Sequence, residues 1–430
     1  MPTHDHPASD RKPGGSEVTT IRAYTLSSAR HVLTLLALGL STLLCAEAAT
    51  AAPGRDAGAI QVTPLATSPI AQKNVVPVRG SDGRFYAVYE LLVTNSVSKP
   101  AKLNSVQVLT PKGRPVARLS AKELIAAGAL LGADRVPVKN TSIGPNESRV
   151  LYLNPSFAER KAVPDRLVQR FDVTGVEPVT GKTERTRYRT GATAVSKRTA
   201  PVLHPPLEGA GWLASNACCQ PTSHVVAMFG LDGRLQAAER FAADWIQIGA
   251  DGRAFHGDPK VLSNWVGYGA PVISAGAGVV SSVHNGRPEQ APQAMPTTLR
   301  IPELPGNDVE VRMKNGLTAV YAHLQKGSVA VQPGDRVKAG QLLGRLGNSG
   351  GSLAPHLHFH VVEGANAVTD DGYPNTFVSF GQTGTVTQEQ LLDLIGGTAP
   401  LPMSLLMNPV PHLKELPLNG TINVFPTQGD

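Results

Sequence analysis

Apolar and polar residues alternate along several segments in the first half of the chain, as is typical of half-buried β-strands. Turn sequences rich in Gly, Pro and Asn separate them. The stretch 120–131 starts with Ser120 as a candidate N-cap and predicts a short helix. We interpret residues 58–195 as an all-β, sandwich-like accessory domain. It holds no cluster of His, Cys or carboxylate residues, so we expect it to bind or position rather than to catalyse. Its strands are expected at 85–95, 103–119, 147–157 and 166–174.

The pattern then divides the rest of the chain into three parts. Residues 196–212 are rich in Pro and Gly and are interpreted as a linker. Short alternating segments resume in 213–385, which predicts a second, mainly antiparallel β domain. The Pro-rich segment 386–430 is expected to be a partly ordered tail with one helical piece at 387–397.

Two hairpins are predicted within residues 309–350 of the second domain. Asn315-Gly316 is a favoured two-residue turn, and it lies between alternating residues in 309–324. Residues 333–350 form a second alternating segment that Gly residues interrupt, so we expect another hairpin there.

Composition supports a mainly β protein with two domains. The 430 residues are 41% hydrophobic, which suffices for two cores. The 43 Gly and 35 Pro residues imply many turns. The formal net charge of +7 favours an anionic partner in general. Because no run of Lys and Arg with interleaved aromatic residues is present, we expect a soluble basic protein without a nucleic-acid partner.

The N-terminal segment has the order of a secretory signal peptide. Basic residues precede the apolar run 32–45, and small residues follow it as far as Ala51. The run is too short to span a bilayer, so residues 1–51 are expected to be cleaved during export to the periplasm or cell exterior. No later segment is long and apolar enough to cross a membrane. Cys45 raises a lipoprotein alternative, but Leu44 before it is larger than a lipid-attachment motif prefers.

Cys218 and Cys219 are adjacent and lie near the expected domain junction. In an oxidising compartment they can form a vicinal disulfide or remain two thiols, and they can also bind a metal. We interpret them as a local structural feature.

Three histidines alternate in "GNSGGSLAPHLHFHV", residues 347–361. In a strand, His356, His358 and His360 project to one side, while Leu357 and its apolar neighbours pack into a core. That geometry suits a metal site or a proton-transfer site.

The order "YAHLQ", "GQLLGRLGNSG" and "PHLHFHV" resembles the lysostaphin/LytM-type zinc metallopeptidases over about residues 220–365. The resemblance implies a Gly-rich antiparallel sheet with the active site in a groove, one zinc ion, and hydrolysis of peptide cross-links in bacterial peptidoglycan. It also implies that His358 and Asp244 are metal ligands. His356 and His323 match the family's two catalytic histidines, which orient and deprotonate a water or stabilise an oxyanion.

The chain departs from the family at the first ligand. Arg240 stands four residues before Asp244 where the family has His, and a guanidinium cannot ligate a cation. His224 is the best substitute, on a predicted hairpin around Asp232-Gly233. A two-residue turn would direct it away from Asp244, whereas a three-residue loop would place it on the same face.

His256, in an expected loop, is a second candidate ligand. Asp244 can instead pair with Arg240 as an ordinary strand-end ion pair. His360 replaces what is usually Glu or another polar residue in the family, and we expect it to face solvent.

Three functions compete. A zinc endopeptidase acting on peptidoglycan explains the retained His323, His356 and His358. A degenerate relative that binds the wall or regulates a wall enzyme explains Arg240. A biotinyl- or lipoyl-carrier module is suggested by the segment "PGDRVKAGQLLG", but it lacks an attachment turn and leaves the histidines unexplained. We favour the endopeptidase.

Overall fold

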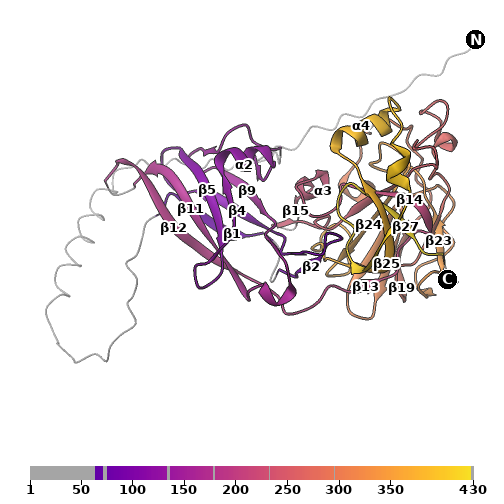
Figure 1. The fold of residues 1–430 in the computed structure, drawn as a ribbon, viewed down its shortest axis with the longest axis horizontal. Coiled ribbons are helices and arrows are strands. Elements are labelled where there is room, and N and C mark those ends of the chain that lie inside the picture. The colour runs from indigo at the N-terminus through magenta and orange to yellow at the C-terminus, as the bar shows by residue number, and fades with distance from the viewer. Residues whose placement is uncertain are drawn as a thin grey trace, which may run out of the picture. The chain divides into compact units, whose positions relative to one another are not determined.

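The computed structural model describes residues 63–70, 75–132, 136–177, 180–231, 233–294 and 296–427. The predicted signal peptide, with Cys45, lies outside the described residues. Both expected domains are built mainly from antiparallel β-strands, which confirms the fold class (Figure 1). Within the described parts of the chain, no helix is long and apolar enough to cross a bilayer.

The accessory domain contains two sheets that share one apolar core. Leu91 and Leu151 from one sheet pack in the same cluster as Val106 and Phe171 from the other. The first sheet has the order β1 (Leu65–Pro69), β4 (Tyr89–Asn95), β9 (Ser148–Leu153) and β7 (Leu130–Leu131). The second has the order β12 (Thr183–Ala194), β11 (Arg166–Val176), β5 (Ala101–Leu109) and β6 (Pro115–Ser120), with β8 (Ser142–Ile143) beside β5. A small third sheet contains β10 (Ser156–Phe157), β3 (Phe85–Tyr86) and β2 (Val78–Arg79).

The predicted helix in this domain forms, but it is shorter than expected. α2 covers Ala121–Ala126. The Ser120 hydroxyl accepts from the backbone N–H of Glu123, and the Glu123 carboxylate accepts from the backbone N–H of Ser120 at 2.7 Å. This reciprocal cap satisfies two backbone donors at the helix start. Gly128 has φ 60° and ends the helix, so that residues 130–131 can pair as β7.

The second domain is organised around a sheet of eleven strands (Figure 1). Its core contains large rings such as Trp212, Trp245, Tyr321, Phe359 and Phe425. The strand order is β13 (Val202–Leu203), β25 (Thr376–Thr385), β27 (Thr421–Phe425), β14 (Gly209–Ser215), β17 (Ala243–Gln247), β24 (Leu357–Val362), β21 (Thr318–Leu324), β20 (Asn307–Met313), β19 (Gly278–His284) and β22 (Arg336–Val337), with β26 (Val410–Glu415) beside β25.

Smaller elements surround this sheet. Two-stranded sheets pair β15 (Phe229–Leu231) with β16 (Arg234–Gln236) and β18 (Pro271–Ile273) with β23 (Leu342–Arg345). The helices are α3 (Ser223–Val226) and α4 (Gln388–Gly396), and α4 begins at the predicted 387–397 piece with Thr387 as its N-cap. Short 3₁₀ helices cover Arg160–Ala162, Leu262–Asn264, Ile301–Glu303 and Met403–Leu406.

One hairpin prediction is confirmed and the other is wrong. β20 and β21 pair antiparallel, and Gly316 takes φ 83° in a loop closed by the Met313 N–H donating to Leu317 O at 2.8 Å. The segment 333–350 instead sends β22 to β19 and β23 to β18. Alternation predicts that a segment is extended, but it does not identify the partner strand.

The expected linker and tail both contribute strands to the main sheet, so neither is a separate irregular segment. β13 and the start of β14 lie within 196–212. From 386–430, β27 inserts between β14 and β25, and Phe425 is buried in the core. Their Pro content suggested irregular backbone, but β13, β14 and β27 are short and free of Pro, and Pro411 lies on β26, which is beside β25.

A buried ion pair joins the accessory domain to the chain just before β17. The Arg240 side chain is 0% exposed, and its Nε donates to Glu90 Oε2 of β4 at 2.8 Å. Arg240 Nη2 also lies 2.7 Å from Glu90 Oε2 and 3.7 Å from Asp371 Oδ1. Arg240 therefore does not pair with Asp244, and it is not exposed to a substrate.

We expect Arg240→Met to lower the free energy of unfolding by about 3–5 kcal/mol, because the buried Glu90 carboxylate would lose its cation. Urea unfolding followed by tryptophan fluorescence measures this change. Arg253→Met is the matched control, since that side chain is 47% exposed, and it should stay within about 0.5 kcal/mol of the parent. Joint replacement by Glu90→Leu and Arg240→Met should recover most of the loss. Unchanged stability of Arg240→Met alone would contradict this account.

Candidate active site

Pairing in the main sheet brings the central acidic residue and a histidine together. Asp244 on β17 and His358 on β24 are direct partners across the antiparallel ladder, so their side chains project to the same face. Ala322 of β21 lies opposite His358 on its other side. His360 follows two residues later on β24 and therefore shares that face. Leu357 and Phe359 point into the core, as predicted.

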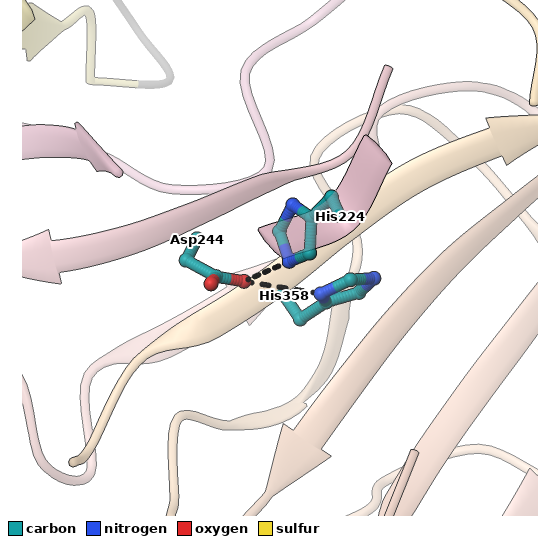
Figure 2. Close-up of side chains that lie close together, drawn as sticks. All are labelled: His224, Asp244 and His358. Carbon is teal, nitrogen blue, oxygen red and sulfur yellow. Dashed lines mark hydrogen bonds and ion pairs between the residues drawn. The ribbon is translucent and has the colours of Figure 1, made fainter. Parts of the chain in front are cut away.

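His224 reaches Asp244 from a different direction than the sequence suggested. It lies on the short helix α3, not on a strand, and the strands of the Asp232-Gly233 hairpin span only three residues each. Neither predicted register therefore applies. Its Nε2 is nonetheless 3.2 Å from Asp244 Oδ1. Figure 2 shows His224 and His358 converging on this carboxylate from α3 and β24.

Three residues bring their potential ligand atoms close enough for one metal ion. Atoms of His224, Asp244 and His358 lie within 4.8 Å of one another, and all three residues are buried. His356 joins them, since its Nε2 is also 3.2 Å from Asp244 Oδ1. Two imidazoles with one carboxylate match the donor types that zinc takes in catalytic sites.

Backbone carbonyls determine which nitrogen of three histidines faces the site. A carbonyl oxygen can only accept, so each imidazole must donate from the nitrogen that contacts it. The Nδ1 atoms of His224, His356 and His323 donate to Asn216 O at 2.9 Å, Ala354 O at 2.7 Å and Ser349 O at 2.8 Å, respectively. In the neutral form, each of these rings therefore carries its lone pair on Nε2.

His360 determines the tautomer of His358 in the same way. Its Nε2 donates to Ala367 O at 3.2 Å, so its Nδ1 accepts from His358 Nε2 at 2.9 Å. His358 then presents the lone pair of Nδ1 to Asp244 Oδ1 at 3.0 Å. The expectation that His360 faces solvent is wrong: it is 4% exposed, because β24 is a central strand and the segment around Ala367 covers it.

The electrostatics of this cluster call for added positive charge. Lone pairs of His224, His356 and His358 all face one oxygen of Asp244, and acceptors repel one another unless a proton or cation lies between them. Although burial opposes charge on the ring, Asp244 raises the pKa of His224 to about 9. Burial lowers the pKa of His358 to about 3, so that ring stays neutral. A divalent cation satisfies the same oxygen and leaves all three imidazoles neutral.

Asn216 supports the cluster, and sequence reasoning did not identify it. Its Nδ2 donates to Asp244 Oδ2 at 2.8 Å, and its carbonyl accepts from His224. It therefore orients two of the three potential ligands, a role that such outer partners commonly have. Asn216 has φ 52°, a left-handed conformation that Asn adopts more readily than most residues.

His323 lies beside the cluster in a strained backbone conformation. Its φ is 60°, and its N–H donates to Pro305 O at 2.8 Å. Its ring centroid is 4.7 Å from that of His356 and 5.6 Å from that of His358. Sparsely populated backbone conformations of this kind concentrate at active sites, where surrounding contacts maintain them.

A cleft of about 390 Å³ opens onto the histidines. Its walls are largely apolar, with Ile246, Leu304 and Leu353 among the lining residues. Among the described residues that line it there is no Lys or Arg, and Glu239 is the acidic residue besides Asp244. Such a site fits a neutral or cationic segment of substrate better than an anionic one.

Two other candidates lie elsewhere. His256 is 62% exposed and 3.7 Å from Asp251, outside the cluster. Cys218 and Cys219 are joined to each other in a disulfide and are buried, so they offer neither thiols nor metal ligands. The Tyr152 hydroxyl donates to Cys219 O at 3.3 Å.

Comparison with known sequences covers part of this site. Residues 265–370 match the family described as Peptidase family M23. This segment includes His323, His356 and His358, whereas His224 and Asp244 precede it.

Two curated relatives are similar over short stretches. The glycyl-glycine endopeptidase ALE-1 of Staphylococcus capitis is 49% identical over 55 residues, which are 13% of this chain and 15% of that protein. The peptidoglycan DD-endopeptidase ShyC of Vibrio cholerae is 36% identical over 92 residues, which are 21% of this chain and 17% of that protein. The chain thus spans less than a fifth of the length of either relative.

Among solved structures, the catalytic domain of lysostaphin from Staphylococcus simulans is 22% identical to this chain. The match covers 38% of this chain and 84% of the lysostaphin domain, with a TM-score of 0.20. The catalytic domain of a prophage-encoded M23 protein from Enterococcus faecalis is 20% identical and covers 40% and 92%, with a TM-score of 0.24. At these TM-scores, the superpositions add nothing to the argument from sequence. Residues 265–370 therefore match peptidase family M23, as the histidine motif within them predicted.

Proposed function

We propose that the protein is an exported zinc endopeptidase that hydrolyses peptide cross-links of bacterial peptidoglycan. The observation that carries this proposal is the convergence of three imidazole nitrogens on Asp244 Oδ1, at 3.0 to 3.2 Å, beside a fourth imidazole in the same cleft. Relatives named for endopeptidase action on peptidoglycan and on glycyl-glycine bonds support the substrate class.

In this proposal, His224, Asp244 and His358 hold the metal. Zinc, when bound, supplies a Lewis acid that polarises the scissile carbonyl and activates a water near neutral pH. The carbonyl of Asn216 accepts from Nδ1 of His224, and His360 accepts from Nε2 of His358. Each of these two rings therefore presents the lone pair of its other nitrogen to the ion. His224 thereby takes the place that Arg240 leaves vacant in the family pattern.

The two remaining imidazoles move protons. Nδ1 of His323 donates to Ser349 O, so the lone pair of this ring lies on Nε2. Unlike the other described imidazoles of the cleft that carry such a lone pair, His323 makes no ion pair with Asp244, so its Nε2 is available to accept a proton from the attacking water. His356 lies next to it, with rings 4.7 Å apart, and can donate a proton to the leaving amine or a hydrogen bond to the oxyanion. The apolar walls limit water access around the scissile bond.

The alternative function, that of a degenerate relative that binds the wall or regulates a wall enzyme, loses its main support. It rested on Arg240 in place of a ligand, but Arg240 is tied to Glu90 and takes no part in the donor set. A protein that only bound the wall would also have no use for histidines whose tautomers are held in this way. Export and association with the cell wall follow from the proposed substrate and the signal-like N-terminal segment.

The first prediction from this proposal concerns the metal. The purified chain should bind about one zinc ion, and His224→Ala should weaken binding about as much as Asp244→Ala or His358→Ala, because each removes one of three ligands. Competition with a chromogenic chelator measures the affinity. His256→Ala is the control and should leave it unchanged. A His224→Ala protein with parental zinc affinity would exclude His224 as a ligand.

The second prediction concerns His360. His360→Leu removes the acceptor for His358 Nε2, so zinc affinity should fall about 10–100-fold, as for other outer partners of metal-ligating histidines. His360→Asn keeps an acceptor oxygen near that position and should retain more affinity. His284→Ala, at a half-exposed histidine paired with Asp308, controls for loss of an imidazole. Equal affinity of the Leu and Asn variants would argue against a tautomer effect.

The third prediction concerns catalysis. His323→Ala and His356→Ala should each keep zinc but lose activity by about 10²–10⁴-fold, as is typical when a general acid or base is removed. Release of new amino groups from purified peptidoglycan measures the activity, and zinc content is determined on the same samples. Full activity in either variant would refute its assigned role. A zinc-loaded parent protein without activity would favour the degenerate alternative.

A further inference from the structure

One face of the accessory domain is strongly basic and has no part in the proposed chemistry. It is the face of the β12-β11-β5-β6 sheet opposite the shared core. The pairing register places six arginines, one lysine and one carboxylate on it among the described residues of these strands. They are Lys102, Arg118, Arg166, Arg170, Arg185, Arg187, Arg189 and Asp172.

Seven of these charged side chains form three rows across the strands. The first row crosses the strands in the order Arg118, Gln107, Arg170 and Arg189. In the second row Asp172 lies opposite Arg187, and in the third Lys102 and Arg185 flank Thr174. Neighbouring strands are about 4.8 Å apart and alternate residues along a strand are about 6.8 Å apart, so the positive charges are densely spaced.

This arrangement is unfavourable for the fold alone. Arg170 and Arg189 are direct cross-strand partners, and like charges in that position are destabilising. The side chains of Arg185 and Arg187 are 60% and 68% exposed, so neither is present to fill a core. A bound anion would relieve this repulsion.

The face is also pre-ordered. Asp172 accepts from Arg185 Nε at 2.7 Å and from Arg187 Nε at 2.7 Å, which fixes both guanidinium groups side by side. The two arginines hold the pKa of the Asp172 carboxyl well below its usual range, so it remains ionised. Arg170 Nε donates to Gln107 Oε1 at 3.0 Å. Guanidinium groups fixed by such contacts lose less entropy when they bind an anion.

A hollow of about 230 Å³ lies among these side chains. Arg118, Arg170 and Arg187 line it together with Ser105, Gln107, Phe171 and Asp172, whose carboxylate is paired with Arg185 and Arg187. It therefore combines guanidinium donors, which bind phosphate oxygens in pairs, with a hydroxyl and an amide that can complete the hydrogen bonding.

We propose that this basic face binds a linear phosphodiester polymer that carries no bases. Charge complementarity favours a polyanion, because six arginines and one lysine against one carboxylate leave a net charge that a ligand with a single anionic group would not neutralise. The surface does not require nucleobases in its ligand. The rings of Phe171 and Tyr188 on these strands are buried in the core and offer no stacking platform. The binding does not depend on the proposed peptidase activity.

The test measures binding of the full chain to synthetic poly(glycerol phosphate) over a series of salt concentrations, with a chelator present so that metal at the other site plays no part. The test variant is Arg118→Gln with Arg187→Gln, which leaves Asp172 paired with Arg185. The control is Arg253→Gln with Arg336→Gln, two exposed arginines of the second domain whose replacement removes the same charge.

We expect the parent and the control to bind with the same steep salt dependence. The test variant should bind about tenfold more weakly at low salt, and the slope of log affinity against log salt should fall by about 0.7 for each arginine removed. Poly-L-glutamate and single-stranded oligothymidylate should bind more weakly than poly(glycerol phosphate).

Three outcomes would overturn the proposal. The first is no binding of poly(glycerol phosphate) by the parent. The second is equal binding by the test and control variants while circular dichroism shows both folded. The third is equal or tighter binding of poly-L-glutamate or oligothymidylate, which would assign the face to carboxylate polymers or to nucleic acid.

Discussion

The candidate active site depends on one oxygen atom, Oδ1 of Asp244. Imidazole nitrogens of His224, His356 and His358 lie within 3.2 Å of it, while Oδ2 is occupied by Asn216. A buried carboxylate oxygen with three such neighbours is stable only with added positive charge, either protons on the rings or a cation among them. The proposed chemistry uses the second solution. The rest of the second domain serves to bring residues from α3, β17 and β24 to this point.

Asp244 constrains its partners because each ring has only two nitrogens. The nitrogen that turns away from the carboxylate must find an acceptor, and carbonyls or His360 provide it in every case. Two residues beside the site adopt an unusual backbone conformation: Asn216, whose carbonyl accepts from His224, and His323 both have positive φ. The backbone strain and the tautomers are therefore parts of a single arrangement, since relaxing a loop would withdraw the acceptor that orients a ring.

Sequence patterns predict those parts of the site that local periodicity determines. Alternation along β24 places His358 and His360 on one face, and the family resemblance identifies His323 and Asp244. The position of His224 was not predictable in this way, because it lies on a four-residue helix that no strand register describes. Arg240 was misread for a related reason: its partner Glu90 is 150 residues away. The Pro-rich segment after residue 385 likewise concealed β27, whose neighbours in the sheet are remote in sequence.

The position of β27 has a consequence for the order of assembly. Residues 421–425 are synthesised after every other strand of the main sheet, yet they pair with β14 on one side and β25 on the other. β14 in turn pairs with β17, the strand that carries Asp244. The sheet cannot close until this segment has left the ribosome, so β14 and β25 stay unpaired until then on the sides that β27 occupies. The strand that carries Asp244 therefore lacks the support of a closed sheet until the chain has been made through residue 425.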